Sequence, residues 1–368
     1  MSKQPEPDTS TFRERGTQAV ITPSNITKNL NTLKQSHPGK TIAVIKANAY
    51  GHGVDLAVPA LAAADAFAVA AITEAQKLRS LSTDKRIILL EGVFNQAELI
   101  MAQQQQFDVV VHQDYQLDIL KDAHPNTSLD VWLKIDTGMN RLGFDITELD
   151  TKLRELQAMP VVKQIRLMSH FASSDDKSCT QTQQQLSLNQ HLKSKGFEYS
   201  FSNTAAVLNQ ISDPHEWVRV GLGLFGISPL PAPHFAASFN LAPAMHLSAN
   251  VIATKHIPKG AQVGYCATYT APEDMRIAIV GIGYADGYPW SHLSSSVLIK
   301  NQLVAVLGRV SMDMIAIDVS KFNEPLTGEE VTIWGEGLPV EQVASDLEMI
   351  PYALVCGVTQ RVKYYVNQ

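Results

Sequence analysis

A single lysine, Lys46, closes the β-branched apolar run TIAVIK that begins at Thr41, and the polar segment ANAYGHG follows it. Such a run is expected to form a strand buried on both faces, so the ammonium at its tip must be solvated, paired or neutralised by chemistry. One interpretation is a strand-end lysine that extends along apolar surface to reach water. The other is an amine that forms a Schiff base with a carbonyl compound. This stretch alone leaves both open.

Two further strand-like runs end in side chains that could take part in chemistry. The segment WLKIDTGMNRLG places Lys134 and Asp136 on one face, where they could form a buried ion pair, and then presents Arg141. The planar guanidinium of Arg141 suits a carboxylate or a phosphate. His170 lies at the tip of the run IRLMSHF, either as a structural hydrogen-bond partner or as an acid or base.

The last two strand-like runs have the composition of an anion site. Ser202, Asn203 and Thr204 lead from a short run into a helix, where they can cap the helix or help to bind an anion. The segment WVRVGLGLFG holds Arg219 and three glycines, which either turn the chain or allow close approach to a phosphate. A Schiff-base lysine near a phosphate site fits pyridoxal phosphate (PLP), the electron sink for chemistry at an amino-acid α-carbon.

These residues require elements that bring the strand ends together. Eight apolar runs alternate with helical segments, at residues 41–46, 66–70, 86–90, 107–111, 129–135, 165–171, 199–202 and 217–220. A helix is predicted from Ser24 onward, ahead of the first run, by Ile26, Leu30 and Leu33 on one face. Eight strand–helix units predict an α/β fold, a parallel (β/α)8 TIM-type barrel, whose reactive residues lie at the C-terminal ends of the strands.

The pattern changes after Gly226. Four prolines in ISPLPAPHFAASFNLAPA indicate a linker, and residues 246–335 show short strands separated by turn residues, typical of a small, mostly β domain. Residues 337–358 predict two short helices, and residues 361–365 predict a closing strand. We therefore expect a poorly ordered leader at residues 1–17, a barrel at 18–240 and a C-terminal β domain at 241–368.

Composition narrows the class of function. The 368 residues are 45% hydrophobic and 18% charged with a net charge of −6, which argues against nucleic-acid and anionic-membrane partners and favours small molecules or a second copy. Three scattered cysteines and the absence of CxxC, HExxH, P-loop and strand-linked GxGxxG patterns predict no metal site, no disulfide framework and no nucleotide site. No apolar run is long enough to span a bilayer and none resembles a signal peptide, so we expect a cytoplasmic protein.

Six motifs, in this order, resemble those of the alanine racemase family: AVIKANAYGHG, KIDTGMNRLG, SHFA, VRVGLGLFG, GYADGYP and GRVSMDM. The resemblance covers nearly the whole chain from about residue 18. It implies a PLP-binding barrel, a β domain and a homodimer whose active sites are shared between subunits. The implied reaction interconverts L-alanine and D-alanine and supplies D-alanine for peptidoglycan.

The resemblance also implies roles for individual residues. Lys46 would hold PLP and act as one base, and Tyr265 would act as the other on the opposite face. Arg219 would hydrogen-bond the pyridine nitrogen, and His170 would link it towards Tyr265. The remaining implied roles are phosphate contacts at Tyr50, Thr204, Gly221, Leu222 and Tyr352, substrate contacts at Arg141, Met312 and Tyr284, and carbamylation at Lys134.

Three positions depart from the family's pattern: Phe225 stands where Tyr is common, Cys266 where Gly is common, and Val220 where Pro is common. All lie beside the expected site, so they bear on substrate selectivity. The alternatives are a broad-specificity racemase of the same fold and a non-catalytic PLP-carrier protein, which would not need the second domain. A barrel decarboxylase would need an acidic residue in place of Arg219.

Overall fold

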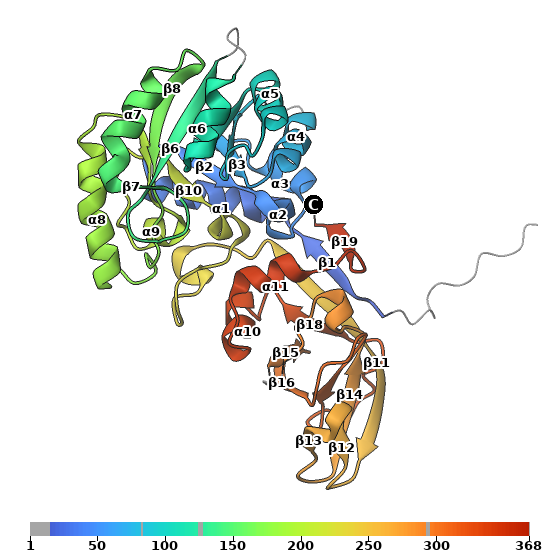
Figure 1. Cartoon of the computed structure of the whole chain (residues 1–368). Helices are drawn as coiled ribbons and strands as arrows, with labels where there is room; N and C mark the ends of the chain where they lie inside the picture. The colour runs from blue at the N-terminus through green and yellow to red at the C-terminus, as the bar shows by residue number, and fades with distance from the viewer. Residues whose placement is uncertain (1–14, 82–83, 124–127, 292–294, 368) are drawn as a thin grey trace, which may run out of the picture. The chain divides into compact units, whose positions relative to one another are not determined.

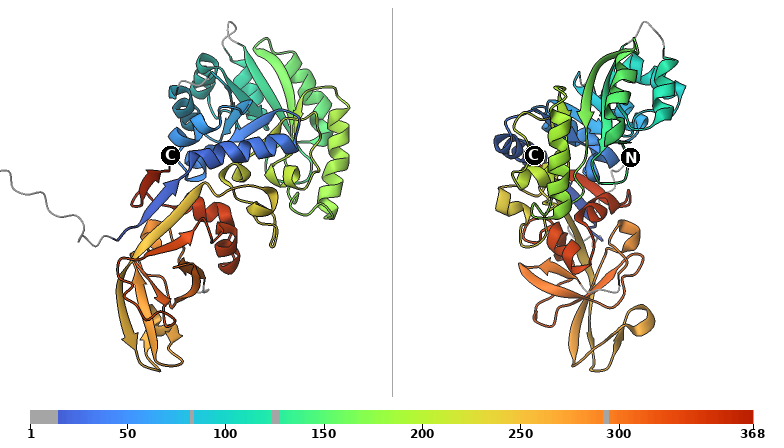
Figure 2. Two further views of the ribbon diagram at one scale, coloured as in Figure 1. Left: turned by 180° about the vertical axis from the view of Figure 1, so that it is seen from behind. Right: turned by 60° about the vertical axis from the view of Figure 1, so that its left-hand side comes forward.

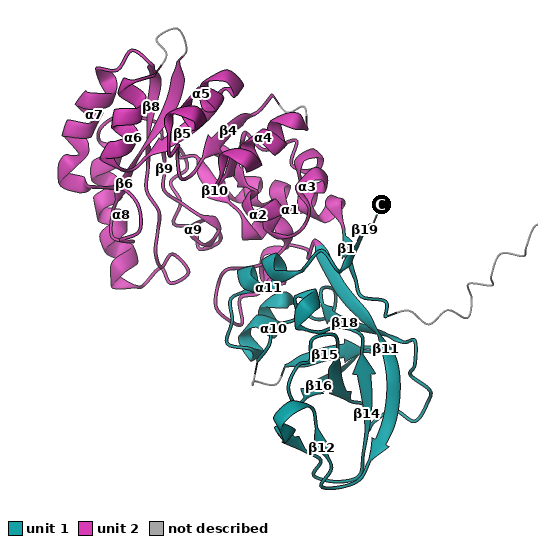
Figure 3. Ribbon diagram, turned by 45° about the vertical axis from the view of Figure 1, so that its right-hand side comes forward, with its two compact units in different colours: residues 1–21, 245–367 teal, residues 22–244, 368 magenta. Residues whose placement is uncertain are grey.

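The computed structural model describes residues 15–81, 84–123, 128–291 and 295–367. These residues form two compact units, which we call the barrel unit and the small unit. The barrel unit comprises residues 22–244, and the small unit comprises residues 245–367 together with the segment before residue 22 (Figure 3). Residues 18–21 therefore lie outside the barrel unit, in contrast to the start at residue 18 expected from the sequence.

The barrel unit is built on one parallel sheet (Figure 1). Its neighbouring strands pair in the order β10-β2-β3-β4-β5-β6-β8-β9, and a short extra strand, β7 (Phe144–Asp145), pairs with β6. The bounds of the eight barrel strands are β2 (Thr41–Val44), β3 (Ala66–Val69), β4 (Arg86–Leu89), β5 (Phe107–Val111), β6 (Leu129–Asp136), β8 (Val162–Met168), β9 (Tyr199–Ser200) and β10 (Val218–Val220). Each contains or overlaps a run predicted from the sequence.

Backbone hydrogen bonds close the seam between β9 and β10. The amide of Trp217 donates to the carbonyl oxygen of Tyr199, and the amide of Arg219 donates to that of Ser202, both at 2.9 Å. The strands are buried on both faces, which explains why they read as continuous apolar runs. The predicted (β/α)8 barrel is confirmed.

Helices follow the strands on the outer side of this sheet. The first, α1 (Pro23–Ser36), is the blue helix in the left view of Figure 2; it begins with proline at its first turn and buries Ile26, Leu30 and Leu33 as predicted. The others are α3 (Val54–Ala60), α4 (Ile72–Ser80), α5 (Gln96–Gln105), α6 (Asp114–Lys121), α7 (Leu149–Gln157), α8 (Thr180–Lys193) and α9 (Thr204–Leu208). Two short 3₁₀ segments are η2 (Ile146–Glu148) and η3 (Leu222–Phe225).

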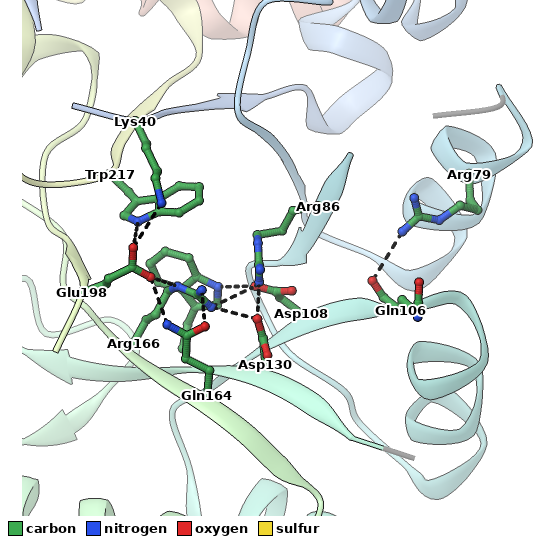
Figure 4. A network of polar contacts seen from close by, with 11 residues as sticks. Lys40, Arg79, Arg86, Gln106, Asp108, Asp130, Gln164, Arg166, Glu198 and Trp217 are labelled. Atoms are coloured by element: carbon green, nitrogen blue, oxygen red, sulfur yellow. Dashed lines mark hydrogen bonds and ion pairs between the residues drawn. The ribbon is translucent and has the colours of Figure 1, made fainter. Parts of the chain in front are cut away.

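A polar network lies at the N-terminal ends of the barrel strands, opposite the ends expected to be reactive (Figure 4). The Arg166 guanidinium, 4% exposed, donates to Glu198 at 2.7 Å and to Asp130 at 3.1 Å. Arg86 donates to Asp130 at 2.6 Å and to Asp108 at 2.5 Å. Alternating cations and carboxylates satisfy one another here, which is how charge is tolerated in a barrel interior.

The small unit is mostly antiparallel. Its main sheet has the order β14-β17-β16-β15-β18-β11-β1-β19, and β12 (Gln262–Val263) pairs separately with β13 (Tyr269–Thr270). The sheet strands are β1 (Gln18–Ile21), β11 (Met245–Ile257), β14 (Met275–Val280), β15 (Ser296–Ile299), β16 (Gln302–Leu307), β17 (Ile315–Asp318), β18 (Glu330–Trp334) and β19 (Lys363–Val366). The predicted pair of C-terminal helices is present as α10 (Val340–Asp346) and α11 (Pro351–Gly357).

The expected leader, residues 1–17, needs correction at its end, and its first 14 residues lie outside the described residues. Arg15 forms an ion pair with Asp286 at 2.7 Å, and the Thr17 hydroxyl donates to the carbonyl oxygen of Gly281. Both contacts tie the start of the described chain to the small unit. Searched over its described residues, the chain has no helix long and apolar enough to cross a membrane.

Candidate active site at the C-terminal end of the barrel

Lys46 lies two residues after β2, at the C-terminal end of the strands, and its side chain is partly exposed. Strand β2 therefore ends sooner than predicted. The segment Lys46–Tyr50, labelled α2, is a left-handed turn, because Ala47, Asn48, Ala49 and Tyr50 have φ angles of 51°, 52°, 56° and 52°. Side-chain sterics disfavour this conformation for residues other than glycine. Strained backbone of this kind clusters at functional sites.

His52 fixes the end of this turn. The ring is fully buried, Nδ1 lies 2.9 Å from the carbonyl oxygen of Tyr50, and the ring stacks on Phe225 at 4.4 Å. A carbonyl oxygen can only accept, so Nδ1 carries the proton. Burial lowers the pKa of His52 from 6.5 to about 4, outweighing the opposing effect of hydrogen bonds to Tyr50 and Ala49. His52 is therefore neutral at pH 7.

Tyr50, Thr204 and Gly221 converge where β9 and β10 end. The Gly221 amide donates to the Thr204 hydroxyl at 3.0 Å, and a Cβ built on Gly221 would lie 2.5 Å from the Tyr50 hydroxyl oxygen. Any larger residue at this position would have to displace the Tyr50 hydroxyl. Asn203 caps α9 by accepting from the amide of Ala206 at 3.0 Å. Hydroxyls and backbone amides converge beside a helix start, as a phosphate site requires, and the buried Leu222 follows directly.

Arg219 is buried on β10 and holds His170. Its guanidinium donates to Nδ1 of His170 at 2.8 Å, to the carbonyl oxygen of Ser169 at 2.7 Å and to both the hydroxyl and the carbonyl oxygen of Ser200 at 2.7 Å. Because arginine has no acceptor, Nδ1 of His170 must be unprotonated and Nε2 carries the hydrogen. Burial, and next the positive charge of Arg219, hold the pKa of His170 well below its usual value.

Lys134 is buried among other cations. Burial, and then the charges of Arg219 and Arg141, lower the pKa of Lys134 from 10.5 to about 8. The ion pair with Asp136 considered from the sequence is not among those of the described residues, and Asp136 instead accepts from the amide of Gly138 at 2.8 Å. Lys134, Arg141 and His170 line one narrow interior space at this end of the barrel.

The site is strongly positive. Lys46, Lys134, Arg141 and Arg219 all act on His170 electrostatically, and none of the four makes an ion pair in the described part of the chain. Burial lowers the pKa of Arg219 to about 10, and the nearest counteracting charge is that of Glu216. Lys134 and Arg219 are buried, and buried charge without an ion-pair partner is costly, so the site calls for anionic groups such as a phosphate and a carboxylate.

Glu216 is a buried carboxylate that sequence reasoning missed. It is 1% exposed and accepts from the amides of Phe201, Ser202 and Asp213 at 2.8, 3.0 and 2.9 Å and from the Ser202 hydroxyl at 2.6 Å. All four groups are donors, so an ionised carboxylate fits them completely. Glu216 thereby fixes the segment that leads from β9 to Thr204. The sequence carries no signal for it, because the burial of Glu216 and its amide partners are visible only in the structure.

Four of the residues named from the sequence belong to the small unit: Tyr265, Tyr284, Met312 and Tyr352. Tyr265 opens a 3₁₀ turn, η5 (Tyr265–Ala267), between β12 and β13, and is 70% exposed. The next residue, Cys266, has a φ of 59°, a left-handed conformation that glycine would adopt without steric cost. Tyr352 lies on α11.

Tyr284 and Met312 lie on two loops joined by backbone hydrogen bonds. The amide of Tyr284 donates to the carbonyl oxygen of Ser311 at 3.1 Å, and that of Ala285 donates to Met312 at 3.0 Å. Both side chains are exposed, by 43% and 51%. The neighbouring Asp286, 1% exposed, accepts from Arg15 and from the amide of Gly283, and Arg361 lies 3.4 Å away. Sequence reasoning missed this cluster of Asp286, Arg15 and Arg361, because its members are far apart in the chain.

No described group of three or more His, Cys, Asp or Glu side chains could hold a metal ion. The residues at the barrel's C-terminal end fit a phosphorylated aldehyde cofactor better. They supply a primary amine, a glycine-lined cradle that a Cβ would fill, and positive charge without carboxylate partners.

Comparison with known proteins agrees with this chemistry. A model described as the alanine racemase N-terminal domain matches residues 21–229, and one described as the C-terminal domain matches residues 244–366. Alanine racemase from Nitrosospira multiformis is 38% identical over 353 residues, covering 95% of this chain and 99% of that protein. Alanine racemase from Coxiella burnetii is 39% identical, covering 94% of this chain and 97% of that protein.

Solved structures give the same result. Biosynthetic alanine racemase from Pseudomonas aeruginosa aligns with a TM-score of 0.93 and 39% identity, covering 96% of this chain and all of that one. Alanine racemase from Bartonella henselae, solved with covalently bound pyridoxal phosphate, aligns with a TM-score of 0.87 and 26% identity, covering 96% of this chain and 100% of that one. The resemblance inferred from six motifs is confirmed, and the chain belongs to the alanine racemase family.

Proposed function

We propose that the protein is a PLP-dependent racemase that interconverts L-alanine and D-alanine at the C-terminal end of its barrel. The single observation that carries the proposal is the unpaired amine of Lys46 in a strongly positive site that contains a glycine-lined cradle. Family membership over nearly the whole chain agrees with it. When bound, PLP supplies the electron sink that makes the α-hydrogen of an amino acid acidic.

Lys46 would hold the cofactor through Nζ. Tyr50, Thr204 and the backbone of Gly221 and Leu222 would bind its phosphate, with Tyr352 as a further contact. Support comes from the Gly221–Thr204 hydrogen bond and from the Tyr50 hydroxyl beside Gly221.

Arg219 would face the pyridine nitrogen. A guanidinium does not give up a full proton there, so negative charge is drawn less strongly into the ring, which disfavours transamination and decarboxylation. Its fixed orientation rests on bonds to Ser169, Ser200 and neutral His170.

Two groups would exchange the substrate's α-proton: Nζ of Lys46 on one face and the phenol oxygen of Tyr265 on the other. Racemisation requires a donor opposite to the acceptor, because a proton removed from one face must be returned to the other. Arg141 and the backbone of Met312 would hold the substrate carboxylate, with Tyr284 near the entrance.

Tyr265, with the exposed small-unit residues Met312 and Tyr284, would act in the active site of a second subunit of a homodimer. The high exposure of Tyr265, Met312 and Tyr284 supports this assignment, because a phenol open to water is a poor proton-transfer group. Large apolar side chains exposed together are also typical of an interface.

Lys134 would be carbamylated. Carbamate formation requires a neutral amine, and the lowered pKa of Lys134 raises the neutral fraction. The product would be an anion close to the positive charges of Arg219, Arg141 and Lys46. It would orient Arg141.

The cellular setting we propose is the cytoplasm of a peptidoglycan-making cell, where the product would be D-alanine for the wall. Cysteines kept as thiols, as Cys179 and Cys266 are in the described part of the chain, suit a reducing compartment.

The test uses purified protein, a panel of L-amino acids and deuterated water. We expect racemisation and α-deuterium incorporation mainly with alanine. Racemisation of many of the amino acids would indicate the broad-specificity alternative. PLP binding without any exchange would indicate a carrier protein. Borohydride should fix PLP on Lys46 in the wild type and leave none on Lys46→Ala.

The two-base assignment is tested separately with Tyr265→Ala, which should slow proton removal from one enantiomer far more than from the other. Tyr269→Phe, a matched tyrosine change on β13, should not alter this ratio. Equal losses for both enantiomers in Tyr265→Ala would contradict the assignment.

A further inference from the structure

The turn that follows Lys46 is strained and must be held. Its four consecutive left-handed residues precede Gly51, itself at φ 79°. Of these positions only the glycine adopts the conformation without steric cost. Local hydrogen bonds hold part of it. The amides of Ala49, Gly51, His52 and Gly53 donate to the carbonyl oxygens of Ile45, Ala47, Ala49 and Asn48 at 3.0–3.1 Å, and the amide of Val54 donates to the Asn48 side chain at 3.0 Å.

A further contact comes from another strand–helix unit. Glu74 accepts from the amide of Ala47, the residue directly after Lys46, at 2.6 Å through Oε1. Its other oxygen, Oε2, accepts from the amides of Ala70 and Ala71 at 2.9 and 3.1 Å. The first bond is the shortest of the three, and it fixes the peptide that carries the Lys46 carbonyl group.

Glu74 also caps its own helix. Helix α4 starts after Ala71, which has no side chain able to cap, so the bonds from Glu74 to Ala70 and Ala71 serve that purpose. Glu98 has the same position in α5, where it accepts from the amide of Phe94 at 2.9 Å and reaches no catalytic turn. Helix capping alone would therefore require only what Glu98 does.

We propose that Glu74 is a positioning residue of the racemase site: its carboxylate clamps the left-handed turn through the Ala47 amide and so fixes the direction in which Lys46 leaves the strand. The inference rests on the proposed function, because it concerns the lysine assigned to PLP. A charge-assisted bond suits this task, since it is short and strong compared with a neutral one. Released from it, the turn would relax towards conformations that its side chains prefer, and fewer molecules would present Nζ correctly.

The experiment compares Glu74→Gln with Glu98→Gln. A carboxamide has one acceptor oxygen, so Glu74→Gln cannot serve both Ala47 and the α4 amides, whereas Glu98→Gln keeps an acceptor for the one amide it binds, that of Phe94. The readouts are the dissociation constant of PLP from the apoenzyme, the fraction of PLP that borohydride fixes on Lys46, and kcat and KM for alanine. We expect roughly tenfold weaker PLP binding and a kcat loss at similar KM in Glu74→Gln only.

A rescue variant separates clamping from capping. Ala47→Gly removes the steric cost of the left-handed conformation at that position, so the double variant Glu74→Gln with Ala47→Gly should regain severalfold PLP affinity over Glu74→Gln. Loss of capping in α4 would not respond to a glycine at residue 47.

Three results would overturn the inference. The first is a Glu74→Gln protein that binds PLP and fixes it on Lys46 as the wild type does, and the second is an equal loss in Glu98→Gln. The third is a double variant no better than Glu74→Gln. If borohydride fixes no PLP on Lys46 in the wild type, the proposed function is refuted together with this inference. That result differs from the three above, in which the wild type binds PLP and only the role of Glu74 is refuted.

Discussion

Replacing Glu216 by glutamine tests whether a buried carboxylate holds the seam of the barrel. The wild-type carboxylate accepts from four donors on the β9–β10 connection and on the approach to Thr204. The amide side chain has the same shape but replaces one acceptor oxygen with a donor group. In the better orientation that NH₂ faces the Ser202 hydroxyl, which can rotate to accept, and the amide of Asp213, which cannot.

The magnitude follows from these contacts. One buried amide without a partner costs about 1–3 kcal/mol, and the remaining bonds each lose about 1 kcal/mol when the acceptor loses its charge. The free energy of unfolding should therefore fall by about 3–5 kcal/mol. For a unit of this size, that corresponds to a Tm about 10 °C lower.

The assay is thermal and urea unfolding of the apoenzyme, with Ser202→Ala as the matched control. Ser202→Ala removes one donor and leaves the carboxylate intact, so it should cost about 1 kcal/mol. If Glu216→Gln melts within 2 °C or so of Ser202→Ala, the carboxylate does not stabilise the seam, and the reasoning is refuted.

Two further predictions concern stability. Arg166→Leu leaves Asp130 and Glu198 short of a partner, so urea unfolding should show a free energy of unfolding lower by about 3 kcal/mol. PLP affinity should stay unchanged, because the network lies at the opposite ends of the strands. A loss of PLP affinity would contradict this prediction. His52 takes up a proton in the unfolded state below pH 6.5 but in the folded state only near pH 4. Lowering the pH from 6.5 to 4 should therefore reduce the free energy of unfolding by up to about 3 kcal/mol. His52→Gln should flatten the pH dependence of unfolding between pH 6.5 and 4, and an unchanged slope would count against a buried neutral ring.

Local patterns were enough to predict the barrel. Each parallel strand is buried on both faces, so it appears as an apolar run, and each crossover helix shows its own period, as α1 does with Ile26, Leu30 and Leu33. The fold rule then placed Lys46 at the reactive end, where the structure has it. The roles assigned to the site residues remain predictions.

Features that depend on distant partners were not predictable. Nothing local marks Ala47 and Ala49 as left-handed, because no glycine stands between Lys46 and Gly51. Glu74 and Glu216 resemble ordinary surface carboxylates in the sequence, and their value comes from amides contributed by other segments. The start of the chain was misjudged for the same reason: the partner of Arg15 is 271 residues away.

The pairing of β1 with both β11 and β19 makes the small unit discontinuous in the chain. During synthesis β1 emerges from the ribosome long before β19, so this sheet stays incomplete until residue 366 has emerged, whereas all barrel strands are available once residue 220 has emerged. Residues 18–21 must therefore wait as an unpaired strand through most of translation. Changes near residues 18–21 and near residues 363–366 therefore act on the same sheet, although the two segments lie far apart in the chain.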